Sequence, residues 1–306
     1  MIGRITNQMS SAMTLSGIET ALDRLDTTQQ QLSTGKRINQ PSDDPSGTGL
    51  ALQLNTQLSN LNTYSNNVTD ATGWTTAATS AMTDITNAVQ RIRSLTVEAS
   101  NGTQTAADMQ ASAQEVNQLI DEIKQDANTQ YNGQYVFSGS ATSTAPYQSG
   151  TNDAYAGNNG TVTRQIGPGT SLAINSNLGS VLGSGQTTAG QPAGDGMLLN
   201  TLRNIADSMQ SGDSSALNGD LTSLDSNFNT LTGLAAQTGA IQDRLQMAAS
   251  RIQTLQASDT QVLSNTQDAD MASTEISFST QQAALTAALQ AGAHIVQESL
   301  MNFLSN

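Results

Sequence analysis

Apolar side chains recur every three and four positions over most of this 306-residue chain. Between Ala78 and Ala99 the spacing is close to a strict heptad, and a second long seam runs from Leu217 to Val262. Gly233 and Gly239 fall where the phase of that second seam shifts. Such spacing places the apolar side chains on one side of an α-helix, which must then pack against another helix. The pattern therefore predicts long paired helices.

The composition also favours thin helical layers over a thick globule. Charged residues make up only 12 % of the chain and aromatic residues 3 %, both low for a compact domain of this length. Ala, Gln, Asn, Ser and Thr take their place, so helices can approach closely while their exposed faces stay polar.

Short polar breaks divide the helical pattern. Gly35, followed by Pro41 and Pro45, predicts the end of a first helix, and Asn101-Gly102 and Gly212-Asp213 predict two further breaks. Tyr135-Val136-Phe137 is typical of a short strand. From residue 138 to 196 the chain is rich in Gly, Ser, Thr and Asn, and its short alternating pieces predict a small β insertion, with a disordered loop as the alternative.

These signals predict a mainly α protein in which both chain arms form an elongated antiparallel coiled-coil or helical-bundle shaft with a small β-rich inserted domain. The apolar stripes reach both extreme ends of the chain, where ends usually fray unless they dock on something. We therefore expect the terminal helices to pack against another copy or a related subunit. The predicted parts are an assembly helix and loop (1–45), shaft helices (46–137), the insertion (138–196), shaft helices (197–265) and a second assembly helix (266–306).

Charge and cysteine content restrict the partners. The net charge is −14, and no basic residue occurs between Arg37 and Arg91, which argues against nucleic acid and against an anionic membrane surface. The chain contains no cysteine, as suits a protein that leaves the cell unfolded. No apolar run is long enough to span a membrane, and residues 1–7 do not begin a cleaved secretory signal.

A search for catalytic, cofactor-binding or metal-binding residues predicts none. His294 is the only histidine, and with Glu298 one turn later it is best explained as a helix-surface or interface residue. Adjacent carboxylates such as Asp43 and Asp44 could bind a cation, but carboxylates just before a helix more often cap its free N–H groups. We expect capping there, and also at Asp268 and Asp270.

Local motifs carry a resemblance to a known family. The stretch Gln31–Asn39, followed by Pro41–Pro45, resembles the N-terminal signature of bacterial flagellins and flagellar hook-associated proteins. Three further segments resemble the hook–filament junction branch of that superfamily: Glu98–Thr103, Asn132–Gly139 with Pro146-Tyr147 after it, and Ala291–Leu300 with Phe303-Leu304 after it. The resemblance covers roughly residues 1–140 and 197–306.

The resemblance implies a structural, non-enzymatic subunit of the flagellum that works outside the cell. It implies export through the flagellar type III apparatus with a chaperone, chain ends that order on assembly, and an insertion that faces outward. Copies would form a ring that joins the hook, through the adjacent hook-associated junction protein, to the flagellin filament. Gly35 would end its helix in the left-handed region, and Arg37 would form an inter-subunit salt bridge. The implied assembly residues are Leu32, Ser33, Gly35, Lys36, Arg37, Ile38, Asp43, Asp44, Leu285, Leu289, Ile295, Val296, Leu300 and Phe303.

Two alternatives stay open at this point. A short flagellin would share the same chain ends but form the filament itself. A cytoplasmic coiled-coil scaffold would share the heptads, although such chains seldom carry a Gly- and Ser-rich insertion in mid-chain.

Overall fold

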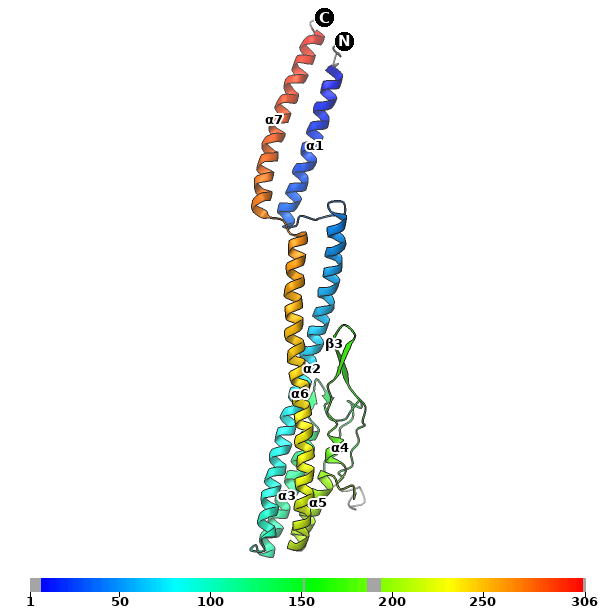
Figure 1. Ribbon diagram of the computed structural model, residues 1–306, viewed down its shortest axis with the longest axis vertical. Coiled ribbons are helices and arrows are strands. Elements are labelled where there is room, and N and C mark those ends of the chain that lie inside the picture. Colours follow the sequence, from blue (N-terminus) through cyan, green and yellow to red (C-terminus); the bar gives the residue numbers. More distant parts are fainter. Residues whose placement is uncertain (1–6, 151, 186–193, 305–306) are drawn as a thin grey trace. The chain divides into compact units, whose positions relative to one another are not determined.

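The computed structural model describes residues 7–150, 152–185 and 194–304. The chain forms two compact units: unit 1 comprises Met1–Asn60 and Leu255–Asn306, and unit 2 comprises Leu61–Thr254. Long helices dominate both units (Figure 1), which confirms the predicted mainly α fold with a small β part.

Unit 1 contains α1 (Asn7–Thr34) and α7 (Met271–Leu304), together with the first turns of α2 (Pro45–Ser100) and the last turns of α6 (Ser214–Gln267). Helices α1 and α7 pack side by side (Figure 1). Thr28 is buried between them and donates a hydrogen bond of 2.7 Å to Gln281 Oε1. Gly292 allows close approach, since a Cβ there would lie 3.3 Å from Thr14 and 3.4 Å from Ile18.

Unit 2 is a helical bundle that contains most of the buried core. The rest of α2 and α6 pack with α3 (Ala106–Ala127) and α5 (Leu198–Ser211). The predicted heptad positions are buried, among them Met82, Ile85 and Ile92 of α2 and Ile120 and Ile123 of α3. This burial accounts for the three-and-four spacing, because each seam faces a neighbouring helix.

The helix ends follow the predicted breaks. Helix α2 ends at Ser100, directly before Asn101-Gly102, and α5 ends at Ser211 with Gly212 in the left-handed region at φ 75°. Helix α6 continues through Gly233 and Gly239, where the phase of its apolar seam shifts. Leu231 and Leu245 are fully buried on either side of these glycines, so packing outweighs the low helix propensity of glycine there.

The segment that joins the two arms contains little regular structure. Strands β1 (Gln130–Tyr131) and β2 (Gln134–Tyr135) form a hairpin, as do β3 (Thr163–Gly167) and β4 (Thr170–Ala173), and α4 (Gly179–Leu182) is a single turn. The strand predicted at 135–137 is displaced, because Val136 and Phe137 leave the ladder and are fully buried.

The insertion shares the core of unit 2. Ile174, Leu178 and Leu182 are fully buried in the same cluster as the helices. The described part of segment 138–196 is thus largely irregular chain folded against the bundle, and within that part the β3–β4 hairpin forms the expected β structure. Among the described residues, no helix is long and apolar enough to cross a membrane.

Candidate assembly site

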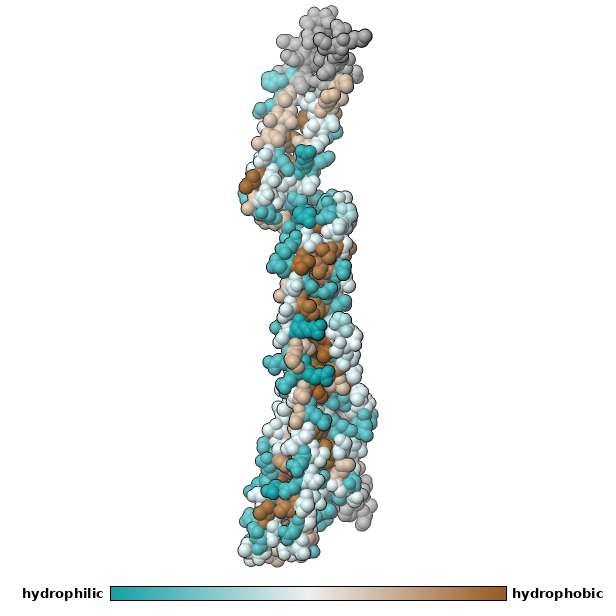
Figure 2. Space-filling model, in the orientation of Figure 1, coloured by the Kyte–Doolittle hydropathy of each residue, from teal (hydrophilic) through white to brown (hydrophobic). Residues whose placement is uncertain are grey.

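Exposed apolar side chains are concentrated in unit 1. Of the twelve large apolar side chains that the described residues expose, eleven belong to this unit and one, Met247, to unit 2. Figure 2 shows apolar side chains open at the surface. The eleven are Met9, Met13, Leu15, Leu22, Leu50, Leu52, Leu255, Val262, Met271, Ile276 and Leu289.

Unit 1 buries few apolar side chains. Its buried apolar side chains, within the described part, are Ile38, Ala51 and Leu54. Two helices packed as a pair can each bury only one face. The remaining apolar faces of unit 1 are therefore available to other chains, as in an interface that closes on assembly.

Two residues of the predicted apolar stripe of the last helix differ in exposure. Leu285 is half-buried, whereas Leu289 is 51 % exposed. In the last turn of α1, Leu32 is half-buried and Ser33 is exposed. The side chains of four further predicted residues lie outside the described part of α7: Ile295, Val296, Leu300 and Phe303.

The two helix breaks of unit 1 meet in one structure, which we call the joint: residues 35–44 together with residues 266–270. Gly35 ends α1 with φ 69°, as predicted. Lys36 and Asp268 form an antiparallel bridge. The Arg37 N–H donates to the Gln267 carbonyl at 2.7 Å, and the Ala269 N–H donates to the Gly35 carbonyl at 2.9 Å. The break in each arm is thus hydrogen-bonded to the break in the other.

Arg37 links the ends of two helices within the joint. Its Nη2 donates to the Thr266 carbonyl in the last turn of α6 at 2.7 Å, and lies 3.3 Å from Asp44 Oδ2. Asp44 Oδ1 in turn accepts the Gly47 N–H at 2.8 Å and so caps α2. These partners of Arg37 belong to its own chain, and the inter-subunit salt bridge that the resemblance implied for Arg37 stays a prediction.

Of the four carboxylates expected to cap helices, Asp44 and Asp270 do so, whereas Asp43 and Asp268 have other contacts. Asp270 accepts the N–H groups of Ala272 and Ser273 at the start of α7, as predicted. Asp43 accepts the N–H groups of Asn39 and Gln40 and so closes the turn before α2. These hydrogen bonds lower the pKa of Asp43, and the Gly47 N–H followed by Arg37 lowers the pKa of Asp44. Asp268 takes part through its backbone bridge to Lys36.

His294 is exposed on α7. Its predicted neighbour Glu298 belongs to the same helix, but the Glu298 side chain lies outside the described part.

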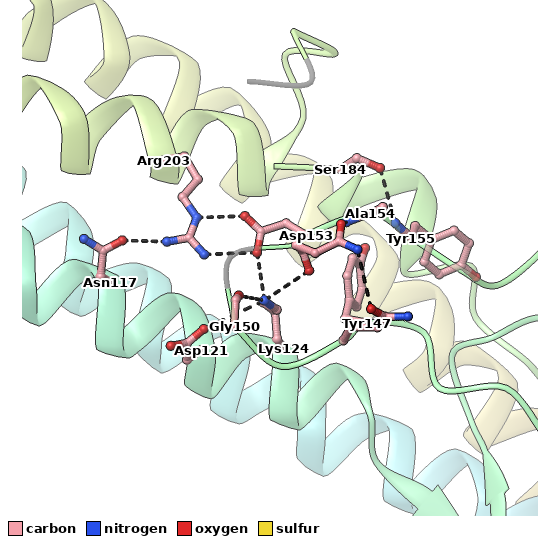
Figure 3. A network of polar contacts seen from close by, with 12 residues as sticks. Asn117, Asp121, Lys124, Tyr147, Gly150, Asp153, Ala154, Tyr155, Ser184 and Arg203 are labelled. Atoms are coloured by element: carbon pink, nitrogen blue, oxygen red, sulfur yellow. Dashed lines mark hydrogen bonds and ion pairs between the residues drawn. The ribbon is translucent and has the colours of Figure 1, made fainter. Parts of the chain in front are cut away.

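The most concentrated group of buried charges lies in unit 2, where the sequence singled out nothing (Figure 3). Asp153 is fully buried and accepts Lys124 Nζ at 2.8 Å and Arg203 Nε at 2.7 Å. Arg203 also donates to Asn117 at 2.6 Å. Each charge is satisfied by a protein partner, so the network anchors the insertion to α3 and α5. Because Asp153 lies 29 and 50 positions from its partners, no local motif could have found it.

A groove of about 390 Å³ between α2 and α3 contains three carboxylates, from Asp84, Glu122 and Asp126. Burial, and then the charges of Asp84 and Glu122, raise the pKa of Asp126 to about 6. The groove holds no nucleophile with a base beside it. Across the described residues no group of His, Cys, Asp or Glu has the geometry to hold a metal ion.

Comparison with known proteins finds similarity to bacterial flagellar proteins. Residues 5–142 match the family model of the bacterial flagellin N-terminal helical region. Flagellar hook-associated protein 3 of Escherichia coli is 28 % identical over 303 residues, which cover 94 % of this chain and 95 % of that protein. The same protein of Salmonella typhimurium is 27 % identical over 194 residues, which cover 63 % of this chain and 61 % of that protein. Flagellin of Bacillus subtilis is 28 % identical over 299 residues, or 94 % of each chain.

Solved structures support the same fold. A putative flagellar hook-associated protein from Vibrio parahaemolyticus matches with a TM-score of 0.63 at 17 % identity and covers 74 % of this chain and all of that one. FlgL of Bacillus cereus matches with a TM-score of 0.57 at 18 % identity and covers 71 % of this chain and 99 % of that one.

Residues 5–142 of the chain thus match the bacterial flagellin N-terminal helical region. Over almost its whole length the chain is similar to flagellar hook-associated protein 3 and to flagellin. These relatives are named as hook-associated proteins and flagellins, which are components of the bacterial flagellum, an extracellular appendage. The relatives are structural flagellar proteins.

Proposed function

We propose that this chain is the hook–filament junction subunit of a bacterial flagellum, and that copies form a ring between the hook and the flagellin filament. The concentration of exposed apolar side chains in unit 1 carries the proposal, because it is the surface a closed assembly would bury. Similarity to hook-associated protein 3 over almost the whole chain supports it.

The proposal assigns a task to each part of the chain. The terminal helices α1 and α7, with the joint, contact other copies and the adjacent hook-associated protein. Segment 138–196 faces outward, and α2, α3, α5 and α6 form the shaft. The chain leaves the cell unfolded through the type III apparatus with a chaperone, which the absence of cysteine suits.

Flagellin itself is the second candidate, since the Bacillus subtilis flagellin matches over a similar length. The two candidates differ in what remains after the gene is deleted. If the chain is the junction subunit, filament subunits are released into the medium. If the chain is the flagellin, filament protein is absent altogether. Recovery of the chain in sheared appendages separates both from a cytoplasmic scaffold.

Two matched substitutions test which surface assembles. Leu22 is 45 % exposed on α1 in unit 1 and Met247 is 64 % exposed on α6 in unit 2, so a charge at either position leaves the buried core intact. In the deletion strain we expect Leu22→Glu to lose most attached filaments and Met247→Glu to retain them. Equal filament counts for the two variants would contradict the proposal that unit 1 is the assembling surface.

A further inference from the structure

We propose that the joint is a clamp that remains closed in the assembled appendage, and that Arg37 is the positioning residue that closes it. This inference rests on the proposed function for its assembly part only. Whether the clamp exists in the free chain is decided separately.

The first support is that two distant breaks are joined by backbone hydrogen bonds. Residues 37 and 266 are 229 positions apart. Even so, the Arg37 and Ile38 N–H groups both donate to the Gln267 carbonyl, at 2.7 and 3.4 Å, and Ala269 returns a bond to Gly35. Two independent linkers would leave these groups to water. Their pairing defines a single register between the two arms.

The second support is electrostatic. A helix C-terminus carries free carbonyls and a partial negative charge, and a helix N-terminus carries the opposite. Arg37 contacts a carbonyl in the last turn of α6, and it also contacts Asp44, the carboxylate that caps α2. One guanidinium thereby joins two helix ends. The other charged groups of the joint are Lys36, Asp43, Asp268 and Asp270.

The third support is close packing. Ile38 is buried to 9 % exposure although it lies in a loop. A Cβ at Gly47 would lie 2.6 Å from Ile38 Cδ1 and 2.5 Å from Asp44 Oδ2. The loop therefore packs onto the first turn of α2 with no room for a methyl group.

A closed clamp changes what assembly has to order. Two free linkers lose conformational freedom when the terminal helices dock, and this loss weakens binding. A joint that is already ordered has lost this conformational freedom when the chain folds, so assembly does not have to order it. The terminal pair α1–α7 is then presented to a second copy as a pre-organised surface.

Hydrogen exchange on the purified full chain tests the clamp without any assembly. We expect the amides of Arg37 and Ala269 to be protected in the wild type. Arg37→Ala should speed their exchange at least tenfold, while Arg24→Ala, a change on the exposed face of α1, leaves it unchanged. The clamp would be overturned if these two amides exchanged in the wild type as fast as in an unstructured peptide. It would also be overturned if Arg37→Ala left their exchange rates unchanged.

A single engineered disulfide tests whether the clamp stays closed after assembly. Lys36 and Asp268 are opposed in an antiparallel bridge, a pairing with Cα atoms about 4.5–5.5 Å apart, which a disulfide can span. In a chain without cysteine, Lys36→Cys with Asp268→Cys can form only this intramolecular bond. We expect sheared appendages of the double variant to form it on mild oxidation as completely as the purified chain does, with each single variant as control.

The outcomes of the disulfide experiment are distinct. Appendages that stay unlinked under conditions that link the purified chain would show an open joint and overturn the inference. If the wild-type chain is missing from appendages, the proposed function fails, and with it the assembly part of the inference. The exchange experiment then still decides whether the free chain has the clamp.

Discussion

Asp153 shows how much one residue can depend on its surroundings. It is fully buried between Lys124 and Arg203, which are themselves almost wholly removed from solvent. Transferring such charges from water is expensive, and only their mutual contacts offset the cost. The residue has no chemical role that the structure supports. Its importance lies in holding the insertion to two helices.

Removing that carboxylate should therefore destabilise unit 2. We expect Asp153→Asn to lower the free energy of unfolding by about 3–5 kcal/mol, because buried Arg203 loses its counter-charge and Lys124 keeps only the exposed Asp121, 3.8 Å away. Urea unfolding followed by the fluorescence of buried Trp74 measures the change. Asp225→Asn breaks the exposed ion pair with Arg93 and should cost about 1 kcal/mol or less. Similar small losses for both variants would show that the buried network is not an anchor.

Asp126 makes the stability of unit 2 depend on pH in the opposite direction from most carboxylates. Its pKa in the folded chain, about 6, lies above the ordinary 3.8, chiefly because of burial. The folded state therefore binds the proton more tightly. This group stabilises folding most below pH 4, and its contribution is lost as pH rises from 4 through 6.

Asp126→Asn should remove that dependence. At pH 7 the variant should be more stable than the wild type by about 1 kcal/mol, less than the full linkage value because the group is partly solvated. The difference should vanish near pH 4. Asp108→Asn provides the contrast, since its contacts with Thr105 lower the pKa of Asp108 and its loss should weaken folding at pH 7. Urea titrations at pH 4 and pH 7 measure these stabilities. If Asp126→Asn is no more stable than the wild type at pH 7, the raised pKa of Asp126 is refuted.

At the scale of elements, the first turn of α2 depends on a glycine that the helical spacing does not require. Gly47 lies against the Asp44 carboxylate and Ile38, whereas Gly49, two positions later, has no atom within 4 Å of an added Cβ. Both are helical and neither has a positive φ. Propensity alone would favour alanine at both positions.

Alanine substitution at these two glycines should consequently change the stability of the start of α2 in opposite directions. Gly49→Ala should stabilise the start of α2 by about 0.5–1 kcal/mol through helix propensity. Gly47→Ala should weaken it by about 1 kcal/mol, because the new methyl group displaces the capping carboxylate. Hydrogen exchange over residues 45–52 measures both changes. A gain in protection for Gly47→Ala would show that Asp44 and Ile38 move aside freely.

At the scale of the whole molecule, the two units differ in how much they bury and therefore in how firmly they fold. Nearly all the buried apolar side chains of the described residues belong to unit 2. The single tryptophan and all five tyrosines also lie there, namely Trp74, Tyr64, Tyr131, Tyr135, Tyr147 and Tyr155. Tryptophan and tyrosine signals thus report on unit 2 alone, while far-ultraviolet circular dichroism reports on both units.

Unfolding of the monomer should consequently occur in two steps. We expect far-ultraviolet ellipticity to fall first as unit 1 melts, with Trp74 fluorescence changing only at higher denaturant, so that the transitions do not coincide. Limited digestion by proteinase K should cut first within α1 and α7 and leave a core that contains Trp74. Coincident transitions, together with protection up to both termini, would contradict an assembly role for the chain ends.

The sequence alone determined the helical class, most helix ends and the absence of a recognisable catalytic set. The α2 seam at Met82, Ile85 and Ile92, and the breaks at Gly35 and Gly212, are local signals, because helix period and backbone freedom depend on neighbouring residues. Tertiary structure decided the continuity of α6 through its glycines, the end of β2 and the burial of Asp153. It also decided the clamp, because Arg37 and Thr266 become neighbours only when both arms fold. Contacts between residues so far apart are determined by how the helices pack, and the spacing of residues along the chain does not predict them.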